Sequence, residues 1–328
     1  MGFVAPLILL LPSVAHACNR MAFREPPDWV RNAGVKAFDG NEAALNLTIG
    51  MTKGPTTFQK YKGLSICLVQ PPNDNSLIRL NYMPGGSKGY DLQGPALHDA
   101  APRATVIDIG ANLGYVAISV AKMRPDLHVI AVEPAPLTFF YMLWNSWLNG
   151  VPTRVITTKS SAAIEPGLEA IHAAIGREGE TIPLHFNPNR TQDTIMDSMY
   201  RRDRSTLGCG SIYSRLTGKR CRNKMGNGLT DIHLVQVPAL DVVALLKRKG
   251  NEAGAVAMAK IDCEGCEVSL LKEEHVRRWF TDRDRVKHIT GELHFHKYPG
   301  FKPFDVEQTR IAYTSRGCKW HGQVHVHC

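Results

Sequence analysis

Several features that would place this chain of 328 residues in a familiar class are absent from its sequence. The apolar run from Phe3 to Leu11 falls well short of the roughly 20 residues that a membrane-spanning helix needs. There are no internal repeats, heptads or low-complexity tracts, which excludes repeat and coiled-coil architectures. The dinucleotide fingerprint G-x-G-x-x-G is also missing, which argues against a nicotinamide oxidoreductase. The apolar fraction of 44% is that of a globular protein with a real core.

The formal net charge of +9 has no single concentrated source. The densest basic groups lie near Arg201, Lys219 and Lys247, and each is mixed with polar or acidic residues. A solvated basic surface is therefore favoured over a dedicated site for a polyanion. We expect no nucleic-acid partner and no stable membrane span.

The amino terminus resembles a secretory signal peptide over residues 1–17, although no Lys or Arg precedes its apolar run. The run is followed by Ala15-His16-Ala17, the small-x-small pattern that signal peptidase accepts. Asn-x-Thr sequons at Asn46 and Asn189 and an even count of eight cysteines agree with an oxidising compartment. We expect a secreted or secretory-pathway glycoprotein with disulfides. The alternative is a buried or frayed amino-terminal segment.

The cysteines allow several pairings, and sequence alone does not determine connectivity. The local pairs Cys209–Cys221 and Cys318–Cys328 are the expected bridges. Cys263 and Cys266 form a Cys-x-x-Cys, which is read as buried thiols or a structural bridge; a redox pair and half of a metal site are the alternatives. The alternating pairs His294/His296 and His325/His327 are read as partly exposed strand residues, so no metal site is expected.

Two regions differ in pattern. Residues 18–102 are irregular and punctuated by proline, which predicts an amino-terminal extension of strands and loops packed on the main domain. Residues 103–328 alternate between strand and helix patterns, with an apparent insertion at about 160–231 that we expect to help cap the substrate site. Strands are predicted at 105–109, 128–132, 153–157, 232–237, 256–261, 288–293 and 323–327, and helices at 113–122, 136–148, 240–249, from 268, and at 306–315. This alternation predicts an α/β fold with a mostly parallel central sheet and helices on both faces.

The most informative segment is VIDIGANLGYVAISVA, Val106 to Ala121, which reads as a buried strand turning sharply into a helix. Asp108 ends the strand, and Gly110, Asn112 and Gly114 form the turn in a D-x-G-x-N-x-G order. Glycine at such a turn lets the backbone approach a ligand closely. Ligands of open α/β sheets bind at this carboxyl edge.

Two further strands end in acids. About twenty residues after the first motif, Glu133 and Pro134 follow an apolar strand, and a carboxylate there can accept the ribose hydroxyls of a nucleoside. The strand that ends in Lys260-Ile261-Asp262-Cys263-Glu264 places more carboxylates on the same rim, and Glu292 and His294 follow the next strand. Such groups can orient or deprotonate a hydroxyl. Lys260 is read as a residue that orients the backbone.

Together these motifs resemble the FkbM family of S-adenosylmethionine-dependent methyltransferases, across about Ala104 to His296. The matching elements are Asp108 to Gly114, Glu133-Pro134, Lys260-Ile261-Asp262-x-Glu264-Gly265-x-Glu267 and Glu292-Leu293-His294. The chain departs from the family at Cys263 and Cys266, where small apolar residues are usual.

The resemblance implies a class I Rossmann-like fold with S-adenosylmethionine as methyl donor. It implies O-methylation of a hydroxyl on a sugar, glycan or small metabolite. It further implies that Asn145 and Asn149 are structural and that Ser161-Ala162 lies near the adenine.

The cofactor residues expected on these grounds are Asp108, Gly110, Asn112, Gly114, Glu133, Pro134, Ser161 and Ala162. Glu264 is the first choice as base, with Glu292, His294 and Asp262 as the other catalytic candidates. The signature of base N-methylation, Asp or Asn followed by Pro-Pro and an aromatic residue, is absent, which argues against a nucleic-acid methyltransferase. The alternative is a non-catalytic binding protein built on a methyltransferase fold.

Overall fold

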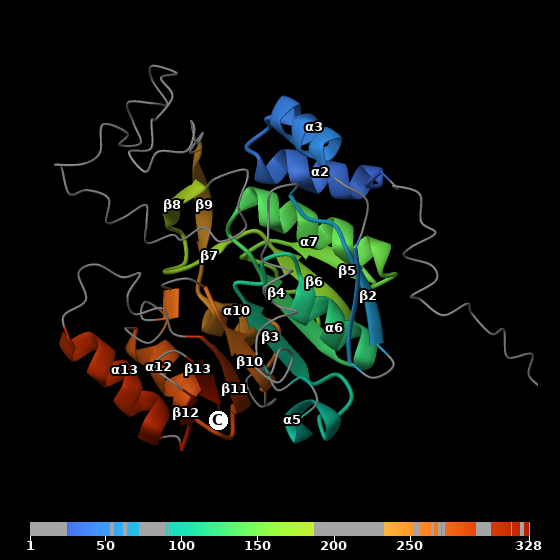
Figure 1. Ribbon diagram of the computed structural model, residues 1–328. Helices are drawn as coiled ribbons and strands as arrows, with labels where there is room; N and C mark the ends of the chain where they lie inside the picture. The colour runs from blue at the N-terminus through green and yellow to red at the C-terminus, as the bar shows by residue number, and fades with distance from the viewer. Residues whose placement is uncertain are drawn as a thin grey trace, which may run out of the picture.

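The computed structural model describes residues 25–52, 56–61, 64–71, 90, 92, 94–186, 233–251, 256–263, 266–267, 270, 273–292, 303–315, 317–321 and 325–327. An eight-stranded sheet forms the centre, in the order β12-β13-β11-β10-β3-β4-β6-β5 (Figure 1). Its strands are β3 (Thr105–Ile109), β4 (His128–Val132), β5 (Thr153–Ile156), β6 (Gly167–Ile171), β10 (Val256–Ile261), β11 (Val286–Glu292), β12 (Lys319–His321) and β13 (His325–His327). The six strands from β11 to β5 are parallel, and β13 and β12 close one edge antiparallel. The predicted fold class is confirmed.

Helices cover both faces of the sheet, as Figure 1 shows. One face carries α6 (Tyr115–Met123) and α7 (Pro136–Leu148); the other carries α10 (Val242–Arg248), α12 (Glu274–Thr281) and α13 (Pro303–Ser315). Successive strand residues point to opposite faces, so Val106 joins the core under α6 and α7 while Ile107 joins the core under α10 and α12. Strands buried on both faces read as continuous apolar runs, which is why β3, β4 and β10 have the predicted bounds.

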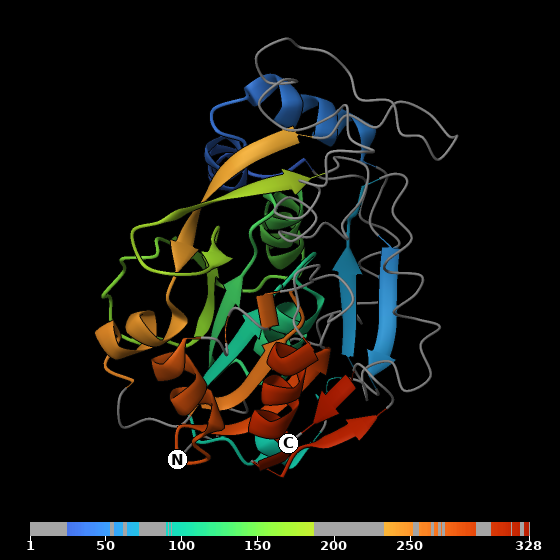
Figure 2. The same ribbon diagram turned by 90° about the vertical axis from the view of Figure 1, so that its left-hand side faces the viewer.

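The amino-terminal extension contains more helix than the sequence pattern predicts. Helices α2 (Asp28–Ala37) and α3 (Glu42–Met51) lie over α7, and the short α5 (Pro95–His98) precedes β3. The sequence pattern of this region predicts strands at 64–69 and 77–82. The first corresponds to β2 (Leu64–Leu68), which pairs with β1 (Thr56–Tyr61), a strand that the pattern does not predict, in a hairpin that Figure 2 shows beside the domain and outside its central sheet. Residues 77–82 lie outside the described part of the chain.

The expected insertion at 160–231 begins later than predicted, because β6 lies inside it and pairs with β4 and β5 in the central sheet. Beyond β6, a separate three-stranded sheet joins β7 (Ala174–Ile175), β8 (Thr181–Phe186) and β9 (His233–Leu240). Residues 187–232 lie outside the described part of the chain. Among the described residues, no helix has the length and apolar character to cross a membrane.

Candidate active site

The parallel register brings the motif-bearing strand ends to one edge. Ile109 pairs with Val132 on β4 and with Ile261 on β10, and Ile261 pairs in turn with Gly291 on β11. The carboxyl ends of β4, β3, β10 and β11 therefore lie side by side. Of the acids expected on one rim, Asp108, Glu133, Asp262 and Glu292 are described and lie at or next to these strand ends, and we take this edge of the sheet as the candidate site.

The turn after β3 needs glycine at two positions. Gly110 has φ +75°, and a Cβ there would lie 1.9 Å from the carbonyl oxygen of Asp262. Gly114 has φ +84° and precedes α6; its added Cβ would lie 2.8 Å from Cγ of Met142. A Cβ at either position would lie too close to a neighbouring atom. Glycine is therefore favoured here both by the close packing and by the left-handed backbone conformation.

Glu133 holds this turn from the end of β4. Its Oε2 accepts a hydrogen bond from the Asn112 amide at 2.7 Å, and Asn112 itself has φ +54°. Its Oε1 accepts from the Ala135 amide at 2.9 Å and from the Thr138 hydroxyl at 2.7 Å, which fixes the start of α7. Burial raises the pKa of Glu133, and these three donors act against that rise.

Asp108 lies beneath the turn and not in it. The side chain is fully buried: one oxygen accepts from the Ala117 amide at 3.1 Å, and the other forms an ion pair with Lys260 Nζ at 3.1 Å. Burial raises the pKa of Asp108, while Lys260 opposes the rise. Asp108 thus joins the first turn of α6 to the end of β10.

Lys260 connects the two loops, in the orienting role that the sequence suggests. Its Nζ donates to the carbonyl oxygen of Gly110 at 2.6 Å and lies 3.9 Å from a carboxylate oxygen of Asp262. Burial lowers the pKa of Lys260, but Asp108 and Asp262 raise it, and the net shift is upward. The ammonium therefore stays charged at neutral pH.

Asp262, one of the described catalytic candidates, contacts Tyr90 and lies near Lys260. Its Oδ2 accepts a 2.7 Å hydrogen bond from the hydroxyl of Tyr90, whose ring also lies under Lys260 Nζ, 5.5 Å from the ring centre. Burial raises the pKa of Tyr90 well above its usual value, and the nearby Asp262 and Glu292 carboxylates add to this. Tyr90 is consequently a neutral hydrogen-bond donor. No motif singles it out in the sequence, where it lies in a region between Tyr61 and Pro95 that carries no legible pattern.

The remaining predicted residues divide into three groups. Glu292 ends β11, where it is half-buried and close enough to raise the pKa of Tyr90. Pro134 follows Glu133, and its carbonyl oxygen lies 2.9 Å from Nε2 of His172.

Ser161 and Ala162 are exposed and do not lie at this rim. The Ala162 carbonyl accepts a hydrogen bond from Lys249, and Lys249 forms an ion pair with Glu169. Glu169 in turn contacts His128 at the start of β4, which is the opposite end of that strand from the candidate site. Glu264 and His294 lie outside the described residues.

Asn145 and Asn149 have the structural role that the resemblance implies. The Asn145 side chain donates to the carbonyls of Leu113 and Val69 and accepts from the Val69 amide. The Asn149 side chain exchanges both hydrogen bonds with the backbone of Cys67. Both therefore attach α7 to the segment around β2.

The described cysteines are oxidised. Cys263 and Cys266 form a disulfide in the turn after β10, and Cys67 and Cys318 are also disulfide-bonded. The bridge at 263–266 agrees with the structural-bridge interpretation of the Cys-x-x-Cys. Cys209, Cys221 and Cys328, which enter the other two expected pairs, lie outside the described residues. In the described part of the chain, no three His, Cys, Asp or Glu side chains gather as a metal site.

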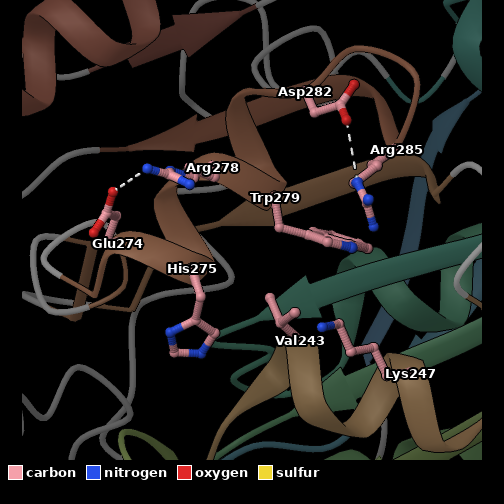
Figure 3. A pocket seen from close by; sticks show the side chains of 8 residues that line it. All are labelled: Val243, Lys247, Glu274, His275, Arg278, Trp279, Asp282 and Arg285. Carbon is pink, nitrogen blue, oxygen red and sulfur yellow. Dashed lines mark hydrogen bonds and ion pairs between the residues drawn. The ribbon is translucent and has the colours of Figure 1, made fainter.

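A separate cavity of about 400 Å³ lies between α10 and α12 (Figure 3). It is lined by Val243, Lys247, Glu274, His275, Arg278, Trp279, Asp282 and Arg285. Glu274 pairs with Arg278, and Asp282 pairs with Arg285 at 3.1 Å. No predicted site residue lines this cavity, so it is separate from the rim described above.

Comparisons with known proteins agree with this geometry. Residues 108–320 match the family model described as "Methyltransferase FkbM domain". The chain is 23% identical over 199 residues to "Methyltransferase 1" of Beauveria bassiana (strain ARSEF 2860), covering 60% of this chain and 68% of that protein. It is also 23% identical over 184 residues to "Methyltransferase sdnD" of Sordaria araneosa, covering 55% and 64%. No solved structure matches. The chain therefore belongs to the FkbM methyltransferase family.

Proposed function

We propose that this methyltransferase uses S-adenosylmethionine to methylate a hydroxyl group of a sugar, glycan or small metabolite. The observation that carries the proposal is the register of β4, β3, β10 and β11, which sets the Glu133-braced turn beside Asp262 and Glu292. In this proposal the turn holds the nucleoside of the cofactor, and the neighbouring carboxylates orient the acceptor hydroxyl.

The chain's own residues fit such a cofactor. Glu133 accepts three hydrogen bonds, while a carboxylate has room for about four, so an acceptor position remains for a ribose hydroxyl. Gly110, Asn112 and Gly114 shape the turn, and all three have positive φ. Pro134 continues the same rim. Ser161 and Ala162 are not included in this proposal because the Ala162 carbonyl contacts Lys249 elsewhere on the sheet.

The cofactor supplies an activated methyl group, so the protein's task is mainly to align the acceptor hydroxyl and manage its proton. Glu264 is our first candidate for the base, because in the sequence it directly follows Cys263, whose Cα lies close to Gly110. Glu292, His294 and Asp262 are the other candidates. Asp262 already accepts from Tyr90, which suits it to orienting the hydroxyl more than to removing its proton.

Calorimetric titration tests the cofactor. S-adenosylmethionine and S-adenosylhomocysteine are titrated into wild type, into Glu133→Ala and into a control, Glu178→Ala, whose side chain lies at the surface in an ion pair with Arg248. We expect binding by wild type and the control, and at least about a tenfold loss in Glu133→Ala. Absence of binding to folded wild type contradicts the proposal. Binding without methyl transfer to any hydroxyl acceptor supports the alternative of a non-catalytic binding protein.

We further propose that the protein functions in the secretory pathway or outside the cell. The disulfide-bonded state of Cys67, Cys263, Cys266 and Cys318 supports this, because such bridges persist in oxidising compartments. The sequon residue Asn46 is exposed on α3, where a glycan could be attached. Expression in a eukaryotic secretory host tests this: we expect cleavage after residue 17 and a mass loss on glycosidase treatment. An uncleaved, unglycosylated intracellular product contradicts it.

A further inference from the structure

The disulfide between Cys263 and Cys266 occupies an unusual place, in the turn that leaves β10 at the candidate site. It closes a turn of only four residues, which includes Glu264. A bridge between residues three apart constrains the unfolded chain very little, so its contribution to global stability is small. Any larger effect of this bridge must therefore be local to the turn.

The turn presses directly against the glycine turn after β3. The hypothetical Cβ on Gly110 would lie 2.9 Å from Cα of Cys263 as well as 1.9 Å from the Asp262 oxygen. The Asp262 amide donates to the Ile109 carbonyl at 3.0 Å, which ties the two segments together. A shift of the Cys263 backbone would therefore change its packing against Gly110 directly.

The two sulfur-bearing residues differ in accessibility. Cys263 is partly exposed, whereas Cys266 is only 3% exposed and belongs to the core beneath α12. The Cys263 amide also donates to the buried Glu267 carboxylate at 3.1 Å, a contact that would remain at the start of the turn without the bridge. Cys263 is therefore the more accessible half of the bridge.

We propose that Cys263–Cys266 is a redox modification site, at which a cellular dithiol reduces the bridge and thereby loosens the methyl-donor site. One thiolate of the reductant attacks Cys263 Sγ and forms a mixed disulfide, and the Cys266 sulfur leaves with the electron pair and takes a proton. The second thiol of the reductant then displaces Cys263, which also takes a proton, and the reductant ends as a disulfide. Two electrons and two protons pass to the protein.

The reduced turn no longer has a covalent link between its ends, so Cys263 and Asp262 gain freedom against Gly110. The predicted consequence is a looser turn over residues 108–114 and weaker cofactor binding, and only the binding consequence rests on the proposed function. A roughly tenfold loss of affinity is within the usual range of coupling between two sites.

Two measurements on the full-length protein test this, each with and without dithiothreitol as the dithiol. The first is hydrogen exchange of the amides in 108–114, which needs no cofactor. The second is calorimetric titration with S-adenosylhomocysteine. Because dithiothreitol also reaches the bridges of Cys67 and Cys318, the control is Cys263→Ser/Cys266→Ser, with Cys263→Ala/Cys266→Ala as a second form should the first fail to fold.

We expect faster exchange and about tenfold weaker binding in reduced wild type. Both double variants should match reduced wild type under either condition. Unchanged exchange on reduction overturns the proposal, as does a double variant that still responds to dithiothreitol like wild type. Faster exchange in a protein that binds no S-adenosylhomocysteine in either state supports the redox site while contradicting the proposed methyl donor.

Discussion

Lys260 donates a 2.6 Å hydrogen bond to the carbonyl oxygen of Gly110, so a buried ammonium on β10 holds the turn that follows β3. The same ammonium forms an ion pair with the fully buried carboxylate of Asp108. Two buried charges of opposite sign therefore support each other directly beneath the candidate site. Removing Lys260 takes this cation away from the buried Asp108 carboxylate, whereas removing Asp108 leaves Lys260 beside the more distant carboxylate of Asp262.

Lys260→Met should accordingly destabilise the protein by about 3–5 kcal/mol, because it leaves Asp108 charged and unpaired in the core. Urea denaturation measures the change. Lys287→Met is the matched control, since Lys287 is exposed and its 3.6 Å pair with Asp284 should contribute less than about 1 kcal/mol. The double variant Asp108→Asn/Lys260→Met should be less destabilised than the sum of its single changes. Strict additivity would contradict a direct interaction.

A pair of glycines separates backbone strain from steric contact. Gly40 and Gly110 have similar φ values, +82° and +75°, but an added Cβ meets nothing within 4 Å at Gly40 and meets backbone at Gly110. Gly40→Ala should cost about 1–2 kcal/mol. Gly110→Ala should cost about 1–3 kcal/mol beyond that and should abolish cofactor binding. Equal losses of stability in the two variants would refute the tight approach of the two loops.

His172 should make stability depend on pH. It stacks on Phe139 near Pro134, and burial lowers its pKa from 6.5 to about 4. Between these values the unfolded chain carries the extra proton, so stability falls as the pH drops from about 6.5 to about 4. The full loss is about 3 kcal/mol.

Urea denaturation across this pH range tests the effect in wild type and in His172→Phe, which keeps an aromatic ring against Phe139. The slope of stability against pH should be smaller in His172→Phe than in wild type. A slope in His172→Phe equal to that of wild type would show that other groups cause the pH dependence.

Asn145 should be among the most sensitive polar positions. Asn145→Ala leaves the amide and carbonyl of Val69 and the carbonyl of Leu113 without this partner, and each such loss costs about 1–3 kcal/mol when the group stays buried. We expect a total loss of about 3 kcal/mol or more by urea denaturation. The neighbouring Ser146→Ala removes one buried hydroxyl that bonds only to Leu143, and should cost about 1 kcal/mol. Comparable losses in the two variants would argue against the role of Asn145.

The sequence predicts the rim of the site well because the relevant strands are short, apolar and bounded by acids and glycines. β3, β4 and β10 have the expected bounds for that reason, as does α7, which starts with Pro136. The first turn of α3 also carries a readable signal, since the Asn41 side chain accepts from the Ala44 amide as a helix cap. The rest of α3 mixes polar and apolar residues without a clear helical pattern, so the sequence does not predict it.

Other elements depend on contacts that no local pattern contains. β6 falls inside the expected insertion because Glu169 interrupts its apolar pattern, yet that carboxylate is buried between His128 and Lys249, 41 and 80 residues away. Tyr90 becomes part of the site through Lys260 and Asp262, the latter 172 residues further along the chain. Partners at such separations are set by the tertiary fold, and a single sequence does not reveal them.

The two asparagines on α7 have a consequence for where the folding unit begins. Four residues of helix rise by about 6 Å and two residues of strand by about 6.6 Å, so Asn145 and Asn149 can meet Val69 and Cys67 in step. The two asparagine side chains thus hydrogen-bond to the backbone of every second residue of this extended segment, as a neighbouring strand would. The family match starts at residue 108, but α7 is hydrogen-bonded to Cys67 and Val69, which precede it. A fragment that begins at residue 103 would therefore lack Cys67 and Val69, the hydrogen-bond partners of Asn149 and Asn145.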